Sequence, residues 1–151
     1  MSVSVKLQHS EDLKFNVQFP DGRRVELNSA EKMGQAFTPM ELFLVSLGGC
    51  TAMDIQWIMS RQRQKLDMLE VSVHGTRREE DPRYYENIEL EYALKGPSLK
   101  KEAVERAVRL SQEKYCSVRA MLNDRVKVKV TYTITNGEGQ EQKFTYTARA
   151  A

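Results

Sequence analysis

The sequence is poor in the side chains that most often bind metals or form disulfide frameworks. It has two cysteines and two histidines in 151 residues. His9 and His74 are isolated in strand-like segments, with no cysteine or carboxylate at a spacing typical of a metal site. We therefore expect neither a metal nor a cofactor.

The sequence also lacks an excess of either charge. Lys and Arg total 23 against 21 acidic residues, for a net charge of +2. This balance gives no electrostatic reason to expect a nucleic acid or a membrane as a partner. The first residues lack the apolar run and cleavage site of a secretory signal, so we expect a cytoplasmic protein. In that reducing compartment two cysteines are more often buried small side chains or reactive thiols than a permanent disulfide.

What the sequence contains is the composition of one globular domain. It is 40% hydrophobic and 29% charged, and no repeat, low-complexity tract or linker divides it. We expect a single domain over residues 1–151. Alternating apolar and polar residues predict strands at 3–7, 13–19, 25–27, 68–76, 88–94 and 126–134, with a further short strand around Phe144 and Tyr146.

Two helices interrupt these strands. The first begins at Thr38, Pro39 and Glu41, which have the pattern of a capping box, and extends to about Gln64. A second helix is expected over 99–110, with Ser98 as its cap. Strands interrupted by two helices predict an α+β fold with antiparallel sheet, because no βαβ crossover is evident between neighbouring strands.

The first helix is uncharged from Leu42 to Met53 and apolar on most sides. One small sheet covers one face of such a helix, so we predict a homodimer that covers the other. A membrane span is a weak interpretation, because Gly48 and Gly49 interrupt the segment and charged residues follow it.

Cys50 follows these glycines, and two interpretations remain open. If the helix breaks at Gly48 and Gly49, Cys50 starts a new helix whose free amides would stabilise a thiolate nucleophile. If the helix continues, the glycines permit a close backbone contact and Cys50 is a small packing residue. Cys116 follows the second helix beside Lys114 and Arg119, and its separation of 66 positions does not show whether it meets Cys50.

Two motifs carry a family resemblance. The sequence resembles the OsmC/Ohr family of thiol-dependent hydroperoxide reductases, and most closely its less characterised OsmC-like branch. The motifs are Thr38-Pro39-Met40-Glu41-Leu42 with Cys50 downstream, and Glu113-Lys114-Tyr115-Cys116-Ser117-Val118.

The resemblance implies an intertwined homodimer with two central helices flanked by sheets. It implies that Cys50 is the peroxidatic thiolate, that Cys116 resolves its sulfenic acid to a disulfide, and that a dithiol such as a lipoyl group reduces the pair. Glu41 matches an acidic residue that orients an arginine toward the thiolate. The arginines that precede the helix here, Arg23 and Arg24, do not stand in the family's glycine-arginine context.

These observations give one leading hypothesis and two alternatives. The leading hypothesis is a peroxidase that reduces small apolar organic hydroperoxides through Cys50 and Cys116. The second is a non-enzymatic, redox-sensing or ligand-binding stress dimer with the same fold. The third is a merely structural role for both cysteines.

Overall fold

The computed structural model describes residues 2–29 and 34–147. The chain divides into two compact units, Met1–Phe43 and Leu44–Ala151, which are described separately below. The expectation of a single domain over residues 1–151 remains a prediction.

The first unit is a three-stranded antiparallel meander, as its alternation predicts, although its first strand begins three residues later than the predicted strand at 3–7. Its strands are β1 (Lys6–Glu11), β2 (Lys14–Gln18) and β3 (Arg24–Leu27). Gly22, at φ +87°, turns the chain between β2 and β3 in a conformation that glycine adopts without strain. Apolar side chains on this sheet line a hollow of about 370 Å³, namely those of Leu7, Leu13, Phe15 and Leu27, together with Pro39.

The second unit contains a four-stranded sheet of order β4-β5-β6-β7. The strands are β4 (Met68–Arg77), β5 (Tyr85–Lys95), β6 (Lys127–Thr135) and β7 (Glu141–Tyr146), all of which the alternation predicts. The α+β class with antiparallel pairing is confirmed, with one correction. β5 and β6 are parallel, with Leu90 opposite Val130, so the helical segment between them forms a crossover. The alternation of apolar and polar residues shows which face of a strand is buried, but it does not show which strand lies beside it in the sheet.

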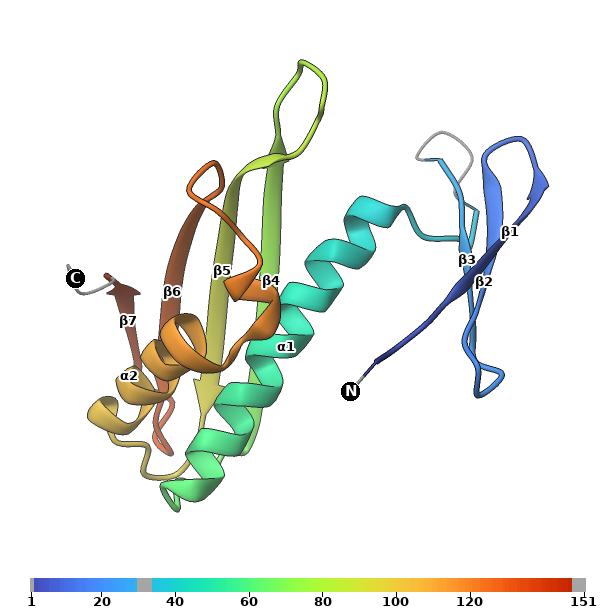
Figure 1. Cartoon of the computed structure of the whole chain (residues 1–151). Coiled ribbons are helices and arrows are strands. Elements are labelled where there is room, and N and C mark those ends of the chain that lie inside the picture. Colours follow the sequence, from blue (N-terminus) through green and yellow to red (C-terminus); the bar gives the residue numbers. More distant parts are fainter. Residues whose placement is uncertain (1, 30–33, 148–151) are drawn as a thin grey trace. The chain divides into compact units, whose positions relative to one another are not determined.

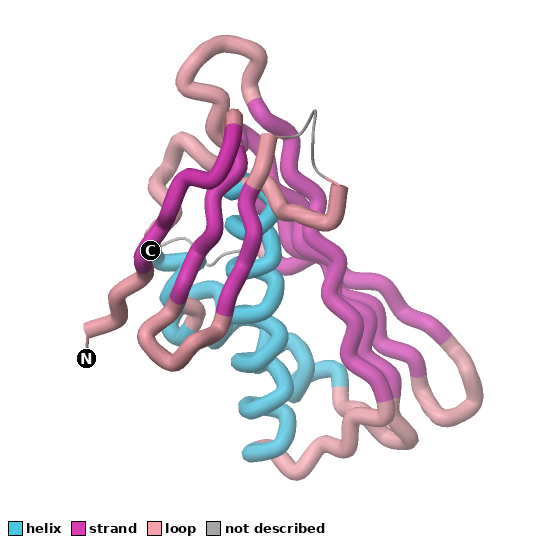
Figure 2. The backbone as a smooth tube through the Cα atoms, turned by 90° about the vertical axis from the view of Figure 1, so that its right-hand side faces the viewer, coloured by secondary structure: helices cyan, strands magenta, loops and turns pink. Residues whose placement is uncertain are grey.

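Helices cover one face of this sheet (Figures 1 and 2). They are α1 (Pro39–Arg61), which begins in the first unit, then α2 (Lys101–Leu110), the π-helix η2 (Ser111–Tyr115) and the short α3 (Ser117–Ala120). The core between helices and sheet is mostly apolar, with Leu47, Ile55, Met59, Ile88, Leu90, Leu94, Val104 and Val108 all buried, and it includes the fully buried polar residues Thr51 and Ser111.

The ends of the helices show one confirmed cap and one corrected cap. The Thr38 hydroxyl accepts from the Glu41 amide at 3.2 Å, and the Glu41 carboxylate accepts from the Thr38 amide at 2.8 Å, which is the predicted capping box. Ser98 does not cap the second helix. α2 starts after Lys100, whose amide donates to the side chain of Gln64 at 2.9 Å, so a residue that follows α1 satisfies this end.

α1 is unbroken through Gly48 and Gly49. A Cβ atom added at Gly48 would lie 2.8 Å from Cγ2 of Val73, so this glycine permits the helix to approach β4 closely. The interpretation in which the helix restarts at Cys50 is therefore excluded.

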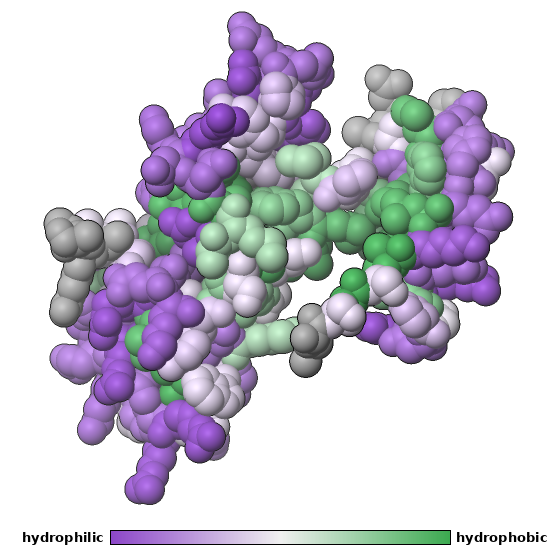
Figure 3. All heavy atoms as spheres, in the orientation of Figure 1, coloured by the Kyte–Doolittle hydropathy of each residue, from purple (hydrophilic) through white to green (hydrophobic). Residues whose placement is uncertain are grey.

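The face of α1 that points away from this sheet is exposed along its length. Val45, Met53 and Trp57 are 62%, 75% and 51% exposed, at multiples of four positions, and we call them the apolar stripe of α1. Figure 3 shows apolar surface over this helix. Among the described residues α1 alone is long and apolar enough to cross a bilayer, a test that core helices of soluble proteins also pass.

Candidate functional site

The site is built on the middle of α1, where Cys50 occupies a half-buried position. Because side chains four positions apart share one face of a helix, Cys50 and Asp54 lie one above the other. Thr51 turns inward from the same turn and is fully buried, with its hydroxyl donating to the Gly48 carbonyl at 3.1 Å. α1 therefore presents one thiol and one carboxylate at the edge of the core.

Cys116 is brought to this face by the π-helix η2. Its backbone amide donates to the Ser111 carbonyl at 3.0 Å, five residues earlier, which closes the wide turn. The chain then turns into α3, and the Arg119 amide donates to Cys116 Sγ at 3.3 Å. The thiol is buried, at 3% exposure. This element was not predicted, because a π-turn has no distinct hydrophobic period.

The structure brings three reactive groups together. Sγ of Cys50, a carboxylate oxygen of Asp54 and Sγ of Cys116 all lie within 4.8 Å of one another, and we call them the thiol cluster. Ser111 joins this cluster to η2, because its hydroxyl donates to Oδ2 of Asp54 at 2.9 Å. Asp54 is a site residue that the sequence analysis missed, although its spacing of four from Cys50 in a helix was a usable signal.

Burial governs the electrostatics of the cluster. Desolvation raises the pKa of Cys116 to about 12, with contributions from the nearby Cys50 and Asp54. Desolvation also raises the pKa of Asp54 above the usual range of aspartate, while the Ser111 hydrogen bond opposes this shift. Cys116 is therefore a neutral thiol at neutral pH, beside a carboxyl group with increased proton affinity.

Tyr92 lies beneath the cluster. It is buried on β5, and its hydroxyl accepts from the Gln112 side chain at 2.9 Å. Burial raises the pKa of Tyr92, and Cys116 and Asp54 contribute to the same shift because their negative forms would lie close to its oxygen. The tyrosine therefore remains a neutral phenol, able to donate a hydrogen bond.

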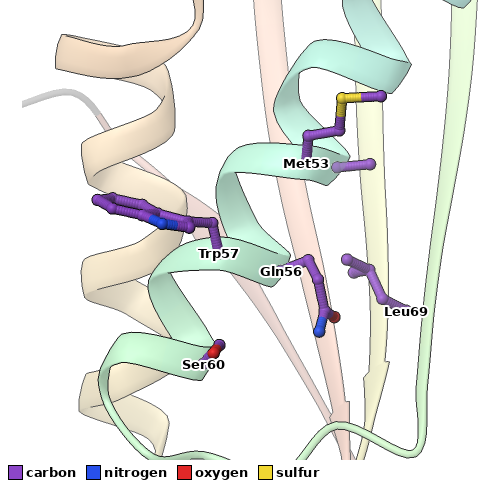
Figure 4. A pocket seen from close by; sticks show the side chains of 6 residues that line it. Met53, Gln56, Trp57, Ser60 and Leu69 are labelled. Carbon is purple, nitrogen blue, oxygen red and sulfur yellow. The ribbon is translucent and has the colours of Figure 1, made fainter.

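An open apolar groove of about 630 Å³ runs along α1, lined by Ala52, Met53, Gln56, Trp57, Ser60 and Leu69, and the three residues of the thiol cluster are not part of this lining. Figure 4 shows Met53, Gln56 and Leu69 on one side of the helix and Trp57 on the other. Trp57 meets the ring of Tyr115, the neighbour of Cys116, edge to face at a centroid distance of 5.8 Å. Aromatic surface therefore adjoins the thiols.

The remaining sequence candidates have other contacts. Glu41 uses its carboxylate in the capping box, and its pKa is lowered by the hydrogen bonds from Thr38. Arg23 pairs with Asp21 at 2.8 Å in its own turn. Lys114 lies over the Tyr115 ring, and Arg119 contacts Cys116 through its backbone amide. None of these contacts directs a cationic side chain at the thiol cluster.

The arrangement is that of a close pair of thiols. Two sulfur atoms within 4.8 Å need only side-chain rotation and a small backbone shift to reach the 2.05 Å or so of a disulfide bond. The adjacent carboxylate lies within 4.8 Å of both sulfurs, close enough to accept a proton from a thiol after a small movement.

The sequence is similar to those of known proteins. A profile of the OsmC-like protein family matches residues 32–131. The chain is 37% identical to Protein YhfA of Escherichia coli over 134 residues, which cover 87% of this chain and 98% of that protein.

Solved structures are similar as well. A hypothetical protein from Aquifex aeolicus matches with a TM-score of 0.79 and 32% identity, over 89% of this chain and 96% of that one. An organic hydroperoxide resistance protein OsmC from Legionella pneumophila, described also as a predicted redox protein, has a TM-score of 0.70. It is 17% identical over 87% of this chain and 96% of its own, so it supports the fold alone.

Proposed function

The chain belongs to the OsmC-like protein family, and on that premise we propose that it is a thiol peroxidase that reduces organic hydroperoxides through Cys50 and Cys116. The observation that carries the proposal is the thiol cluster itself. Two cysteines 66 positions apart in the sequence lie with a carboxylate within 4.8 Å of one another. The family match supports redox chemistry and does not by itself identify the substrate.

In the proposed reaction, Cys50 is the attacking thiolate because it is the more exposed of the two sulfurs. Its sulfur bonds to the terminal oxygen of the hydroperoxide while the O–O bond breaks, and the alkoxide leaves as an alcohol after protonation. Cys50 then carries a sulfenic acid. Cys116 attacks that sulfur, an S–S bond forms and the hydroxyl group leaves as water. A small dithiol, such as a lipoyl group, returns the pair to thiols by exchange.

Asp54 acts as the proton acceptor for Cys116 in this scheme. Cys116 has a pKa of about 12, so at neutral pH its attack on the sulfenic acid requires loss of a proton to a nearby base. The Asp54 carboxylate is the acceptor within reach, and Ser111 orients it. The proton can then be passed to the departing hydroxyl group.

The apolar surroundings favour a hydrophobic hydroperoxide over hydrogen peroxide. Met53 and Trp57 line the open groove along α1, and the Tyr115 ring packs against Trp57. An alkyl chain lying on these side chains would gain about 0.8 kcal/mol per buried methylene. We therefore place the substrate's tail along this groove, between α1 and the second chain that would cover Met53 and Trp57 in the dimer proposed below.

We also propose that the active form is a homodimer. The apolar stripe of α1 leaves three large side chains exposed in the single chain, which is typical of a surface that another chain covers. In the dimer, Glu41 would orient an arginine that faces Cys50, the role implied by the family resemblance.

The experiment is a steady-state assay of the reduced protein with cumene hydroperoxide and a dithiol, in buffer that contains a metal chelator. We expect catalytic consumption of peroxide by the native protein and loss of at least 99% of it in Cys50→Ser. Cys116→Ser should form the Cys50 sulfenic acid once, detectable by dimedone labelling, and then turn over poorly. Full activity in Cys50→Ser, or no consumption by the native protein, would refute the proposal.

A redox-sensing or ligand-binding dimer is the second candidate function. The observation that favours it is the absence of a cationic side chain among the described contacts of the cluster, since a peroxidatic thiolate is usually stabilised by positive charge. Stoichiometric disulfide formation with no turnover in the same assay would support this function.

A further inference from the structure

The thiol cluster also has the donor set of a metal site. We propose that the reduced protein binds one thiophilic divalent cation, such as Zn²⁺, through Sγ of Cys50, a carboxylate oxygen of Asp54 and Sγ of Cys116. A metal site is a property separate from peroxide reduction. It revises the expectation that no metal binds, which rested on the spacing of the two histidines. The sequence does not show this cluster, because Cys116 comes close to Cys50 and Asp54 only in the folded chain.

The geometry of the three donors is close to that of bound zinc. The donor atoms lie within 4.8 Å of one another. In tetrahedral sites with Zn–S of about 2.3 Å and Zn–O of about 2.0 Å, donors lie roughly 3.3–3.8 Å apart. A contraction of about 1 Å is within reach of side-chain rotation, because Cys50 and Asp54 stand on consecutive turns of α1. Their half-buried positions leave room for water as a fourth ligand.

Neighbouring groups already hold two of the donors in place. The Ser111 hydroxyl donates to Oδ2 of Asp54 at 2.9 Å, which leaves Oδ1 for an ion. The Arg119 amide donates to Sγ of Cys116 at 3.3 Å, a contact that stabilises a metal-bound thiolate as well as a thiol. Such outer contacts orient ligands and increase metal affinity.

The donor types select the class of ion. Two thiolates and one carboxylate suit Zn²⁺, Co²⁺ or Cd²⁺, whereas Mg²⁺ and Ca²⁺ require oxygen ligands. Binding replaces two thiol protons, which are released to solvent, and no electron is transferred. The three negative donors are then largely balanced by a charge of +2, in a place where none of the contacts seen among residues 2–29 and 34–147 brings a cationic side chain to them.

Metal binding and oxidation exclude each other at this site. A bound ion holds the sulfurs about 3.8 Å apart and uses their lone pairs, whereas the disulfide requires about 2.05 Å. The ion would therefore protect the dithiol from peroxide, and the oxidised protein would not bind it.

The test is an anaerobic titration of the reduced, full-length protein with Co²⁺ alone. We expect one ion per chain, with thiolate-to-cobalt charge-transfer absorption and intense visible bands of a four-coordinate ion, both lost on addition of Zn²⁺. Cys50→Ser and Cys116→Ser should each lose at least half of the charge-transfer intensity. Asp54→Asn should weaken binding about tenfold or more. Asp124→Asn, at an exposed aspartate, should bind like the native protein.

A titration without charge-transfer absorption would overturn the proposal, as would Asp54→Asn binding Co²⁺ with native affinity. Circular dichroism of each variant checks that it is folded. The disulfide form is a further comparison that needs no substitution, and its binding of Co²⁺ at the native level would also overturn the proposal. The peroxidase assay contains a chelator and this titration contains no peroxide, so either result stands without the other.

Discussion

At the scale of the residue, the two cysteines differ in burial, and this difference should set their reactivity. Cys50 is half-buried, whereas Cys116 is buried with a pKa raised to about 12. Because the thiolate is the reactive form, iodoacetamide at neutral pH should label Cys50 at least about tenfold faster than Cys116. Peptide mass spectrometry of timed samples measures both rates in one protein.

The control for this measurement is the same protein in denaturant, where both thiols should react at similar rates. The labelling rate of native Cys116 should increase as the pH is raised through 9 and 10. Equal rates in the native protein would show that the burial of Cys116 does not control its chemistry.

Asp54 gives a prediction that couples stability to pH. Its pKa is higher in the folded protein than in the unfolded chain, so the folded state favours the protonated form. The folded state therefore loses relative stability as the pH rises through the folded pKa, and at neutral pH the half-buried carboxylate is destabilising. Asp54→Asn, which keeps the shape and can accept from Ser111, should melt at an equal or slightly higher temperature than the native protein at pH 7.

The stability difference between Asp54→Asn and the native protein should shrink from pH 7 toward pH 4, because protonation of the native carboxyl group increases as the pH falls. Scanning calorimetry at the two pH values measures it. A variant less stable at pH 7 than at pH 4, relative to the native protein, would contradict the sign of the pKa shift of Asp54.

Disulfide formation in Asp54→Asn should be about 100-fold slower than in the native protein, because the variant lacks the proton acceptor.

At the scale of the element, the two central glycines of α1 should behave differently. A Cβ atom at Gly48 would lie 2.8 Å from the stiff side chain of Val73, whereas a Cβ atom at Gly49 meets nothing within 4 Å. Gly48→Ala should lower the free energy of unfolding by about 1–2 kcal/mol through overpacking. Gly49→Ala, the matched control, should raise it by about 0.5–1 kcal/mol through helix propensity. Both substitutions are made in a Met53→Glu background, because Gly49 lies between Val45 and Met53 on the face of α1 that a second chain would cover. Urea denaturation measures both, and equal effects would contradict the close packing of α1 on β4.

The same elements show what the sequence could predict about the site. The capping box at Thr38 and the apolar run of α1 follow from local patterns, and the spacing of Cys50 and Asp54 follows from a continuous helix. The approach of Cys116 does not, because it depends on the π-turn at Ser111 and on the packing of η2 beside α1. Both features depend on tertiary packing, and neither leaves a periodic pattern of apolar residues in the sequence.

At the scale of the whole molecule, the dimer is the main prediction. Met53→Glu places a charge in the middle of the apolar stripe of α1, where a second chain would have to bury it. The variant should be monomeric at concentrations where the native protein is dimeric. Asn87→Glu adds the same charge at an exposed position of β5 and should remain dimeric. Light scattering coupled to size-exclusion chromatography measures the masses, and a dimeric Met53→Glu would exclude the stripe as the interface.

The larger architecture was partly predictable from the sequence. The alternation of apolar and polar residues located six of the seven described strands, because a strand packed on one face alternates between buried and exposed positions. The exception is β1, which was expected at 3–7, runs over Lys6–Glu11 and is exposed at all six positions. The parallel pairing of β5 and β6 was missed, since alternation shows which face of a strand is buried and does not show which strand lies beside it. Pairing depends on the path of the whole chain.

If Cys50 and Cys116 form a redox pair, a single peroxide treatment should join them in a disulfide. The reduced protein is treated with one equivalent of cumene hydroperoxide in metal-free buffer, and its peptides are mapped without reduction. We expect a disulfide between Cys50 and Cys116 within one chain, a mass loss of two hydrogens and no such bond in Cys50→Ser. Two free thiols, or a stable sulfenic acid on Cys50 with Cys116 unmodified, would contradict it.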